Sequence, residues 1–251
     1  MRTYKPKRKL HHKKKGVNMK SILIPLIVVL LVGIFGLYLP IRSIQAKGKE
    51  LQVTAGKVKE GFKKNDLDAV SKELDTMKVQ YASFQKSAQG IYWARFIPVA
   101  GGYVSDFKHG VQAGDRLLQA GTISVDAITP YADLLGFKKD GAGFANKSAD
   151  ERIQTAVLTL DKVLVKVDQI AVHVDAAQKD IDEIDTGHYP EKFGNKVIRS
   201  RIETLRSEFD AVASLFVDAK PFMKKLPDIL GASEEKTYII LFQNDKELRP
   251  T

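Results

Sequence analysis

Residues 22–39 read ILIPLIVVLLVGIFGLYL, eighteen apolar, aromatic or small residues without a charged side chain. A helix of about 20 apolar residues crosses the hydrocarbon core of a bilayer. Pro25 lies near the start of the run, where the missing backbone N–H does little harm to a helix, and Gly33 and Gly36 are tolerated in membrane helices. The run therefore predicts a transmembrane helix, which we place at residues 21–41.

The positive charge of the chain is concentrated just before this run. Nine basic residues and no acidic residue precede it: Arg2, Lys5, Lys7, Arg8, Lys9, Lys13, Lys14, Lys15 and Lys20. By the positive-inside rule, residues 1–20 form a basic cytoplasmic tail and the chain after the run is extracytoplasmic, with Lys13, Lys14, Lys15 and Lys20 as the topology signal. The same lysines would attract anionic lipid head groups, at about 1 kcal/mol per charge near the surface.

Two other interpretations of the apolar run are less favoured. A cleaved signal peptide has an apolar core of roughly 7–15 residues, and the nearest cleavage candidate, Ile44-Gln45-Ala46, is a poor match to the small-x-small pattern. A buried core helix does not explain the basic flank or the length without charge. We therefore expect a single-pass protein of the cell membrane, with the lipid bilayer as its first partner.

The chain after the tail is nearly neutral. The formal net charge is +10, and the first twenty residues supply +9 of it. This distribution, and a tail without an aromatic stacking platform, argue against a nucleic-acid partner. The chain has no cysteine, which excludes disulfides, thiolate metal sites and thiol catalysis. The roughly 210 extracytoplasmic residues suffice for a sizeable hydrophobic core.

Apolar residues recur at alternating spacings of three and four over residues 42–232, which predicts an antiparallel bundle or stalk of long helices with coiled-coil seams. Asp66 caps the second helix and Gly90 ends it. Ser148 and Glu151 have the spacing of a capping box. The other expected helices are 41–64, 103–135, 149–185 and 192–219. A separate short turn is expected between Pro221 and Pro227.

Residues 91–102 read IYWARFIPVAGG, and we call this segment the aromatic corner. Three interpretations are open: an exposed recognition loop, a membrane-surface patch in which Tyr92 and Trp93 touch lipid, or a buried corner between two helical pairs. The buried corner is favoured.

Residues 237–242 read TYIILF, which predicts a strand buried on both faces. A single strand cannot form a sheet. We therefore expect residues 233–251 to begin an α/β domain that is truncated or missing here, so that the fold class is mainly α with the start of an α/β domain.

A polar constellation, Asn244, Asp245, Glu247 and Arg249, follows this strand. Ligand sites often lie beyond the carboxyl ends of strands, and Arg249 could clamp a phosphate or carboxylate with its planar fork. Alternatively, Glu247 pairs with Arg249 or Lys246 and only fixes a turn. The structural alternative is favoured.

Two segments, LPDILG at residues 226–231 and YIILFQNDKELRPT at residues 238–251, resemble the signature of the domain-of-unknown-function 4012 family of bacterial membrane-anchored envelope proteins. RFIPVAG at residues 95–101 is similar to the family's upstream segment. The family pattern runs on into Gly-Gly-Phe, which this chain lacks, so the resemblance covers the N-terminal part of the family. It implies a single-pass protein with a large extracytoplasmic part, in bacteria with elaborate surface polymers. It implies no catalytic residue.

No motif in the sequence indicates an enzyme or a metal centre. HExxH, P-loop and GxSxG patterns are absent from the sequence, and His173 and Asp175 are two residues apart, so they cannot face each other on a helix. The acidic cluster Asp180, Asp182, Glu183 and Asp185 is interpreted as a solvated face rather than a cation site. We expect no cofactor, no metal and no catalytic residue.

Three functions are compatible with this sequence. The favoured one is a membrane-anchored extracytoplasmic scaffold or stalk of the cell envelope or surface-polymer machinery, which holds a C-terminal domain away from the membrane and has an envelope polymer or a protein as partner. The second is an envelope polymer transferase or hydrolase whose active domain continues beyond residue 251. The third is a sensory helical bundle that acts through a partner protein, since the short tail has no room for a transducer domain.

Overall fold

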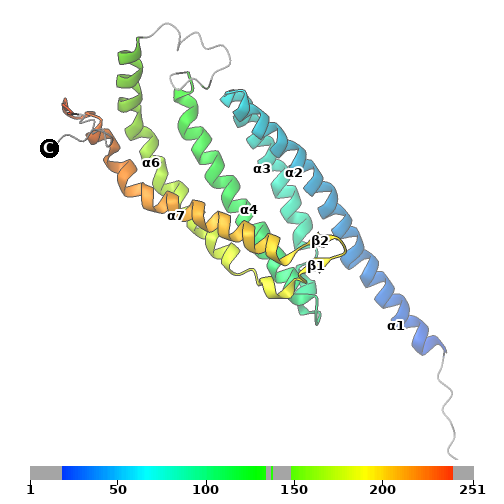
Figure 1. Ribbon diagram of the computed structural model, residues 1–251. Helices are drawn as coiled ribbons and strands as arrows, with labels where there is room; N and C mark the ends of the chain where they lie inside the picture. The colour runs from blue at the N-terminus through cyan, green and yellow to red at the C-terminus, as the bar shows by residue number, and fades with distance from the viewer. Residues whose placement is uncertain (1–18, 134–136, 138–147, 240–251) are drawn as a thin grey trace, which may run out of the picture.

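A computed structural model describes residues 19–133, 137 and 148–239, and most of them are helical (Figure 1). A helical rod opens the described chain. It consists of three segments without a break: α1 (Met19–Leu31), the π-helical η1 (Val32–Tyr38) and α2 (Leu39–Lys63). Within the described residues, the rod is the one helix that is long and apolar enough to cross a membrane.

Most of the large apolar side chains described on the first part of the rod are not covered by the rest of the described chain. Large side chains that stay exposed on it include Leu26, Leu30 and Phe35. This surface differs from that of a core helix in a soluble protein, whose apolar side chains are buried against other elements. The last segment of the rod, α2, is the first helix of the chain that packs along another long helix.

The helix α3 (Leu67–Gln89) returns along α2, as the break at Asn65-Asp66 predicts. Asp66 caps α3 by accepting a backbone N–H of its first turn at 2.9 Å. Asn65 has a φ of 52°, the left-handed conformation that such a tight reversal requires. The two helices are antiparallel, with the hydroxyls of Ser43 and Ser87 2.9 Å apart at the end near η1.

The aromatic corner connects α3 to α4 (Gly101–Ile128) and contains the 3-10 turn η2 (Tyr92–Phe96). A corner between two helices is therefore confirmed. Its burial holds for Ala94 but not for Phe96 and Val99, whose exposed fractions are 76 and 91 %. Trp93, Arg95 and Pro98 are exposed too, and Ala94 is the one buried residue in the segment. The expectation that this segment is a buried corner is therefore wrong.

The helix expected at residues 103–135 ends earlier than its apolar stripe suggests. The α-helical part stops at Ile128, and the 3-10 turn η3 (Thr129–Tyr131) follows. Thr129 is succeeded by Pro130, which has no N–H to continue the ladder of helical hydrogen bonds.

The helix α6 (Ala149–Asp182) begins with the predicted capping box. The Ser148 hydroxyl accepts the Glu151 backbone N–H at 3.2 Å, and the Glu151 carboxylate accepts the Ser148 backbone N–H at 2.9 Å. The 3-10 turn η4 (Thr186–His188) follows the end of α6. The capping box can be predicted from the sequence because its two residues, Ser148 and Glu151, are only three positions apart.

A small hairpin precedes the last helix, where the sequence predicts helix from residue 192. Strands β1 (Lys192–Phe193) and β2 (Lys196–Val197) are antiparallel, and α7 (Arg199–Ile229) begins after them. The loop between the strands has two residues, and the first, Gly194, has a φ of 60°. Glycine at this position is a hairpin signal, and it explains why the helix starts late.

The helix α7 runs through Pro221 and Pro227, where the sequence predicts a separate short turn. A proline removes one backbone donor, but its φ of about −65° is compatible with a helix. Pro227 is buried, so packing favours keeping this end of the helix intact. The separate turn is therefore absent, and one helix extends to Ile229.

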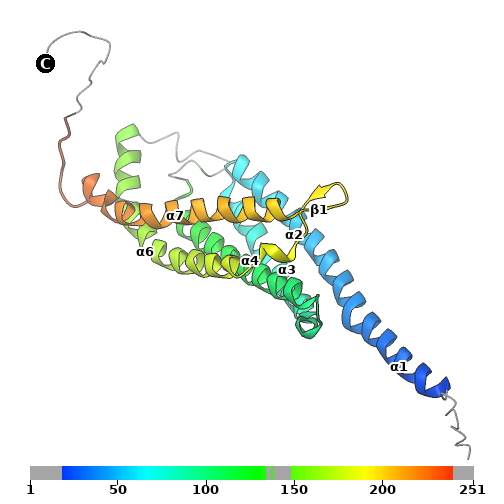
Figure 2. The ribbon, with the colours of Figure 1, turned by 60° about the horizontal axis from the view of Figure 1, so that its bottom comes forward.

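Successive long helices pack on one another in chain order. Helix α2 lies on α3, α3 on α4, α4 on α6 and α6 on α7, and neighbours are antiparallel (Figures 1 and 2). Helix α7 packs mainly on α6. We call the set from α2 to α7 the helical array. It is a row of helices in series rather than a closed bundle.

One cluster of the hydrophobic core lies at the end of the array that is remote from α1, and other buried apolar side chains, such as Val111 and Val167, lie further along it. The buried members of the cluster are Leu67, Val70, Leu74, Val125 and Ala132. Close approach of α2 and α3 depends on Gly61, because a Cβ there would lie 2.7 Å from a methyl group of Val70. The seam predicted along α3 thus begins in the core and continues toward the aromatic corner.

The strand predicted at residues 237–242 is absent from the part that the structure describes. Residues 237–239 form no strand, and Tyr238 and Ile239 are exposed, while residues 240–242 lie outside the described residues. Strand propensity expresses packing and pairing with neighbours, and the two described strands pair with each other. An α/β domain beginning at residue 233 stays a prediction.

Candidate functional site

The predicted site residues lie mostly outside the part of the chain that the structure describes. They are the constellation Asn244, Asp245, Glu247 and Arg249 and the tail residues Lys13, Lys14 and Lys15. Lys20 lies in the first turn of α1, before the apolar run. The constellation as a ligand site and the tail as a topology signal and head-group contact stay predictions.

The most buried charged side chain among the described residues belongs to Asp106 of α4, which is 3 % exposed. One carboxylate oxygen accepts the backbone N–H of Asp185 at 3.1 Å. The other lies 2.8 Å from Nδ1 of His188. We call this arrangement the Asp106–His188 clasp, because it fastens the connection between α6 and α7 onto α4.

Local structure places His188 against α4. The Asp185 side chain accepts the Gly187 backbone N–H at 2.8 Å and so starts the 3-10 turn that carries His188. On the other side, a Cβ at Gly102 would lie 2.6 Å from atoms of the His188 ring. Only glycine at residue 102 leaves space for the imidazole, so the first turn of α4 is shaped for the clasp.

The carboxylates around the clasp stabilise the imidazolium form of His188. The hydrogen bond from His188 to Asp106 is the main cause of a raised His188 pKa, and the charges of Asp106 and Asp185 add to it. Nε2 of the same ring lies 3.5 Å from the Asp185 carboxylate. Burial, followed by the charge of Asp106, raises the pKa of the neighbouring Tyr189 to about 12, so that its hydroxyl stays protonated at neutral pH.

The polar contacts of the clasp join segments that are distant in the chain. Both ring nitrogens of His188 face carboxylates, and among the described residues no hydroxyl nucleophile is hydrogen-bonded to the ring. The described residues also contain no group of three or more His, Asp or Glu side chains arranged to hold a metal ion. We therefore interpret the clasp as a charge-assisted contact between distant segments.

The clasp should make stability depend on pH. Because folding raises the pKa of His188 above its usual 6.5, the contribution of the imidazolium is fully present below pH 6.5 and is lost as pH rises through the higher pKa of the folded state. Thermal unfolding followed by circular dichroism in detergent should show a difference in Tm between the wild type and His188→Gln that shrinks as pH rises. A difference that grows with pH would contradict this assignment.

The acidic cluster on α6 is only partly the solvated face that the sequence suggests. Asp180 lies 3.6 Å from Nδ1 of His109, and Asp182 forms an ion pair of 2.6 Å with Arg206 of α7. Asp182, Glu183 and Asp185 are exposed, as a solvated face predicts, and the interpretation is wrong for Asp180, which is partly buried beside a neighbouring helix. A spacing rule within one helix could not find pairs that are separated by 24 residues or more in the chain.

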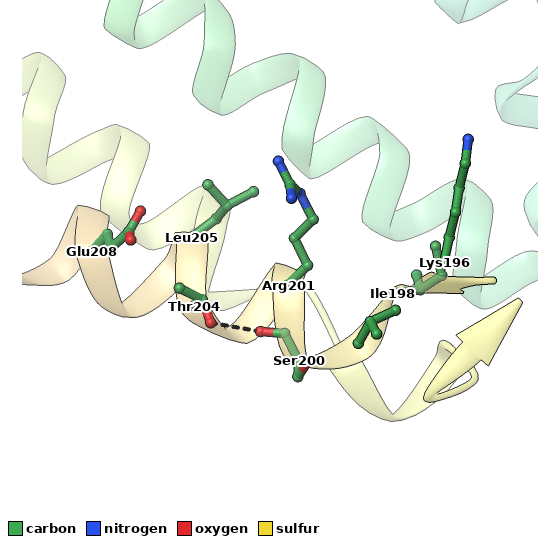
Figure 3. Close-up of a pocket in the computed structure, with 8 residues that line it drawn as sticks. Lys196, Ile198, Ser200, Arg201, Thr204, Leu205 and Glu208 are labelled. Atoms are coloured by element: carbon green, nitrogen blue, oxygen red, sulfur yellow. Dashed lines mark hydrogen bonds between the residues drawn. The ribbon is translucent and has the colours of Figure 1, made fainter.

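An open groove of about 900 Å³ runs along the hairpin and the beginning of α7 (Figure 3). Arg201, Leu205 and Glu208 are among the side chains that line it. The Thr204 hydroxyl donates to the Ser200 carbonyl of the same helix at 2.8 Å, so it is already engaged. Polar groups in this groove do not converge on a common point, and we assign no binding chemistry to it.

Comparison with known proteins adds no homologue to these observations. No family model, no curated protein and no solved structure matches the chain. The resemblance to the 4012 family therefore stays a prediction that rests on the segments quoted above.

Proposed function

We propose that the protein is a single-pass, membrane-anchored scaffold whose helical array stands outside the cytoplasm as part of the bacterial cell envelope. The observation that carries this proposal is the rod formed by α1, η1 and α2. Its first half is an apolar helix with exposed side chains, and its second half is the first helix of the array. A lipid environment removes the cost of exposing that apolar surface to water.

The orientation follows from charge. The nine basic residues before the apolar run favour a cytoplasmic N-terminus, which puts the array on the opposite side of the membrane. The resemblance to the 4012 family supports a role in the envelope of bacteria with surface polymers. An open row of antiparallel helices without a catalytic constellation among the described residues supports a holding role, with an envelope polymer or a protein as the partner.

Orientation can be tested with engineered cysteines, because the chain has none of its own. We expect Val79→Cys, at an α3 position that is 73 % exposed, to react with a membrane-impermeant maleimide in intact cells. His12→Cys in the tail should react only after the cells are permeabilised. The reverse pattern would contradict the proposed topology.

The same cells distinguish an anchor from a cleaved signal sequence. An epitope placed before Arg2 should remain on the full-length protein in a membrane fraction washed with alkaline carbonate. A mature protein that lacks the epitope and is found in the medium would contradict the anchor.

A further inference from the structure

The aromatic corner is attached to the apolar part of the rod by a single tryptophan. Nε1 of Trp93 donates a hydrogen bond of 3.1 Å to the carbonyl of Gly36 in η1. The indole lies so close to the rod that a Cβ at residue 36 would be 2.9 Å from Cζ2 of Trp93. Glycine at residue 36 is therefore what permits this contact.

The Gly36 carbonyl lacks one of the donors that a helix usually offers. At α-helical spacing its donor would be the N–H four residues later, but that residue is Pro40, which has none. At the spacing of the π-helical η1 the donor would be the N–H of Ile41, five residues later. Backbone polar groups in a lipid environment need a partner inside the protein. Trp93 supplies one from the turn between α3 and α4.

This contact places the corner at the edge of the predicted span. Gly36 lies three residues before Leu39, the last residue of the apolar run, which is about 5 Å along a helix at 1.5 Å per residue. In both views the turn between α3 and α4 is the part of the array that projects furthest toward α1 (Figures 1 and 2). If the run spans the bilayer, the corner lies at its extracytoplasmic interface.

The side chains that the corner exposes suit that interface. Phe96 and Val99 are the most exposed of its apolar residues, and Trp93 is exposed on one side. An apolar groove of about 460 Å³ continues from Trp93 onto Leu31 and Phe35 of the rod. Tryptophan is enriched at membrane interfaces, and apolar surface that continues into a membrane span is covered by lipid rather than by water.

The aromatic corner also carries a positive charge, that of Arg95. The guanidinium of Arg95 lies 4.7 Å from the centre of the Phe96 ring, and it is exposed. Beside a membrane surface such a cation would meet the phosphates of lipid head groups. The neighbouring aromatic ring would enter the apolar layer below them.

We propose that the aromatic corner is a second membrane contact, in which Trp93, Phe96 and Val99 insert into the extracytoplasmic interface beside the rod while Arg95 meets lipid phosphates. This rests on the proposed anchor function and adds to it. Two contacts with the bilayer, the rod and the corner, fix the tilt of the helical array relative to the membrane. A single helix alone would leave the array free to swing.

Trp93 is the one tryptophan of the chain, so its fluorescence reports on the corner directly. The full chain is reconstituted into vesicles of phosphatidylcholine and phosphatidylglycerol, with lipids brominated at different depths of the acyl chain. We expect shallow bromines to quench Trp93 more than deep ones, and we expect acrylamide in the water to quench it little. Strong quenching by acrylamide with none by brominated lipid would overturn the proposal.

A matched pair of variants separates insertion from mere docking of Trp93 on the rod. Phe96→Asp should lower quenching by brominated lipid at least twofold, because it puts a charge into the interface. Phe222→Asp alters an exposed phenylalanine (58 % exposed) near the far end of α7 and should leave quenching unchanged. Equal quenching in both variants would show that the corner does not insert.

Flotation of the vesicles on a density gradient keeps this test apart from the test of the anchor. A chain that does not float with the vesicles contradicts the proposed anchor, and the corner proposal with it. A chain that floats, but whose Trp93 is quenched only from the water, contradicts the corner proposal alone.

Discussion

Replacement of Leu67 by alanine is expected to lower the free energy of unfolding by about 2–5 kcal/mol, the usual range for truncating a buried leucine. Leu67 is 2 % exposed and belongs to the core with Val70, Leu74, Val125 and Ala132. This core joins α3 to α4, so the cavity left by the variant weakens two helix contacts at once. Chemical denaturation in detergent, followed by circular dichroism, would measure the loss.

The control for this prediction lies on the same helix. Val79 is 73 % exposed, and Val79→Ala should change the free energy of unfolding by no more than about 0.5 kcal/mol. Similar losses in both variants would mean that the cluster around Leu67 is not a core in solution.

The second large effect is expected at the clasp. Asp106→Ala removes a buried carboxylate that accepts two hydrogen bonds, from the Asp185 N–H and from His188, and each such bond contributes about 0.5–1.5 kcal/mol, so a loss of about 1–3 kcal/mol is expected. Asp106→Asn should cost less, because its amide oxygen can still accept one hydrogen bond. Both variants should weaken the pH dependence that His188 gives to the Tm, because the main cause of the raised His188 pKa is gone while Asp185 remains beside the ring.

An exposed aspartate provides the comparison for this pair. Asp75 forms a surface ion pair with Lys78 at 3.1 Å, and surface pairs contribute little. Asp75→Ala should therefore leave both stability and its pH dependence nearly unchanged.

Hydrogen exchange should show faster exchange of backbone amides around residues 183–198 in Asp106→Ala than in the wild type. A loss of protection spread evenly over the chain would contradict the clasp.

Local signals in the sequence were enough to place most helices. The Asp66 cap, and the Ser148 and Glu151 capping box, lie where their spacing predicts, because each involves residues three apart. The seam on α3 predicted the burial of Leu67 and Val70. The apolar run predicts a helix long enough to span a membrane, and the structure has a long apolar helix there whose large side chains are mostly exposed.

The order of packing and the polar contacts could not be read from the sequence. Asp106 and His188 are 82 residues apart in the chain, and only the antiparallel arrangement of α4 and α6 brings them together. The hairpin before α7 has a local signal, the turn dipeptide Gly194-Asn195, but each flanking strand has only two residues, which is too short to interrupt the helical periodicity of the segment. The predicted strand is absent at residues 237–239 because an apolar segment with high strand propensity still needs a neighbouring strand to pair with.

Because the helices pack in a row, the helix at the end of the row is the easiest to separate from the rest of the protein. An interior member of the row, such as α4, is held on two sides, whereas α7 is held mainly by α6 and by a few surface ion pairs such as that between Lys220 and Asp168. In such one-dimensional arrangements, stability is a sum of neighbouring contacts, and the terminal member frays first. We therefore expect α7 to separate from α6 and pack again on it while the other helices of the array keep their structure.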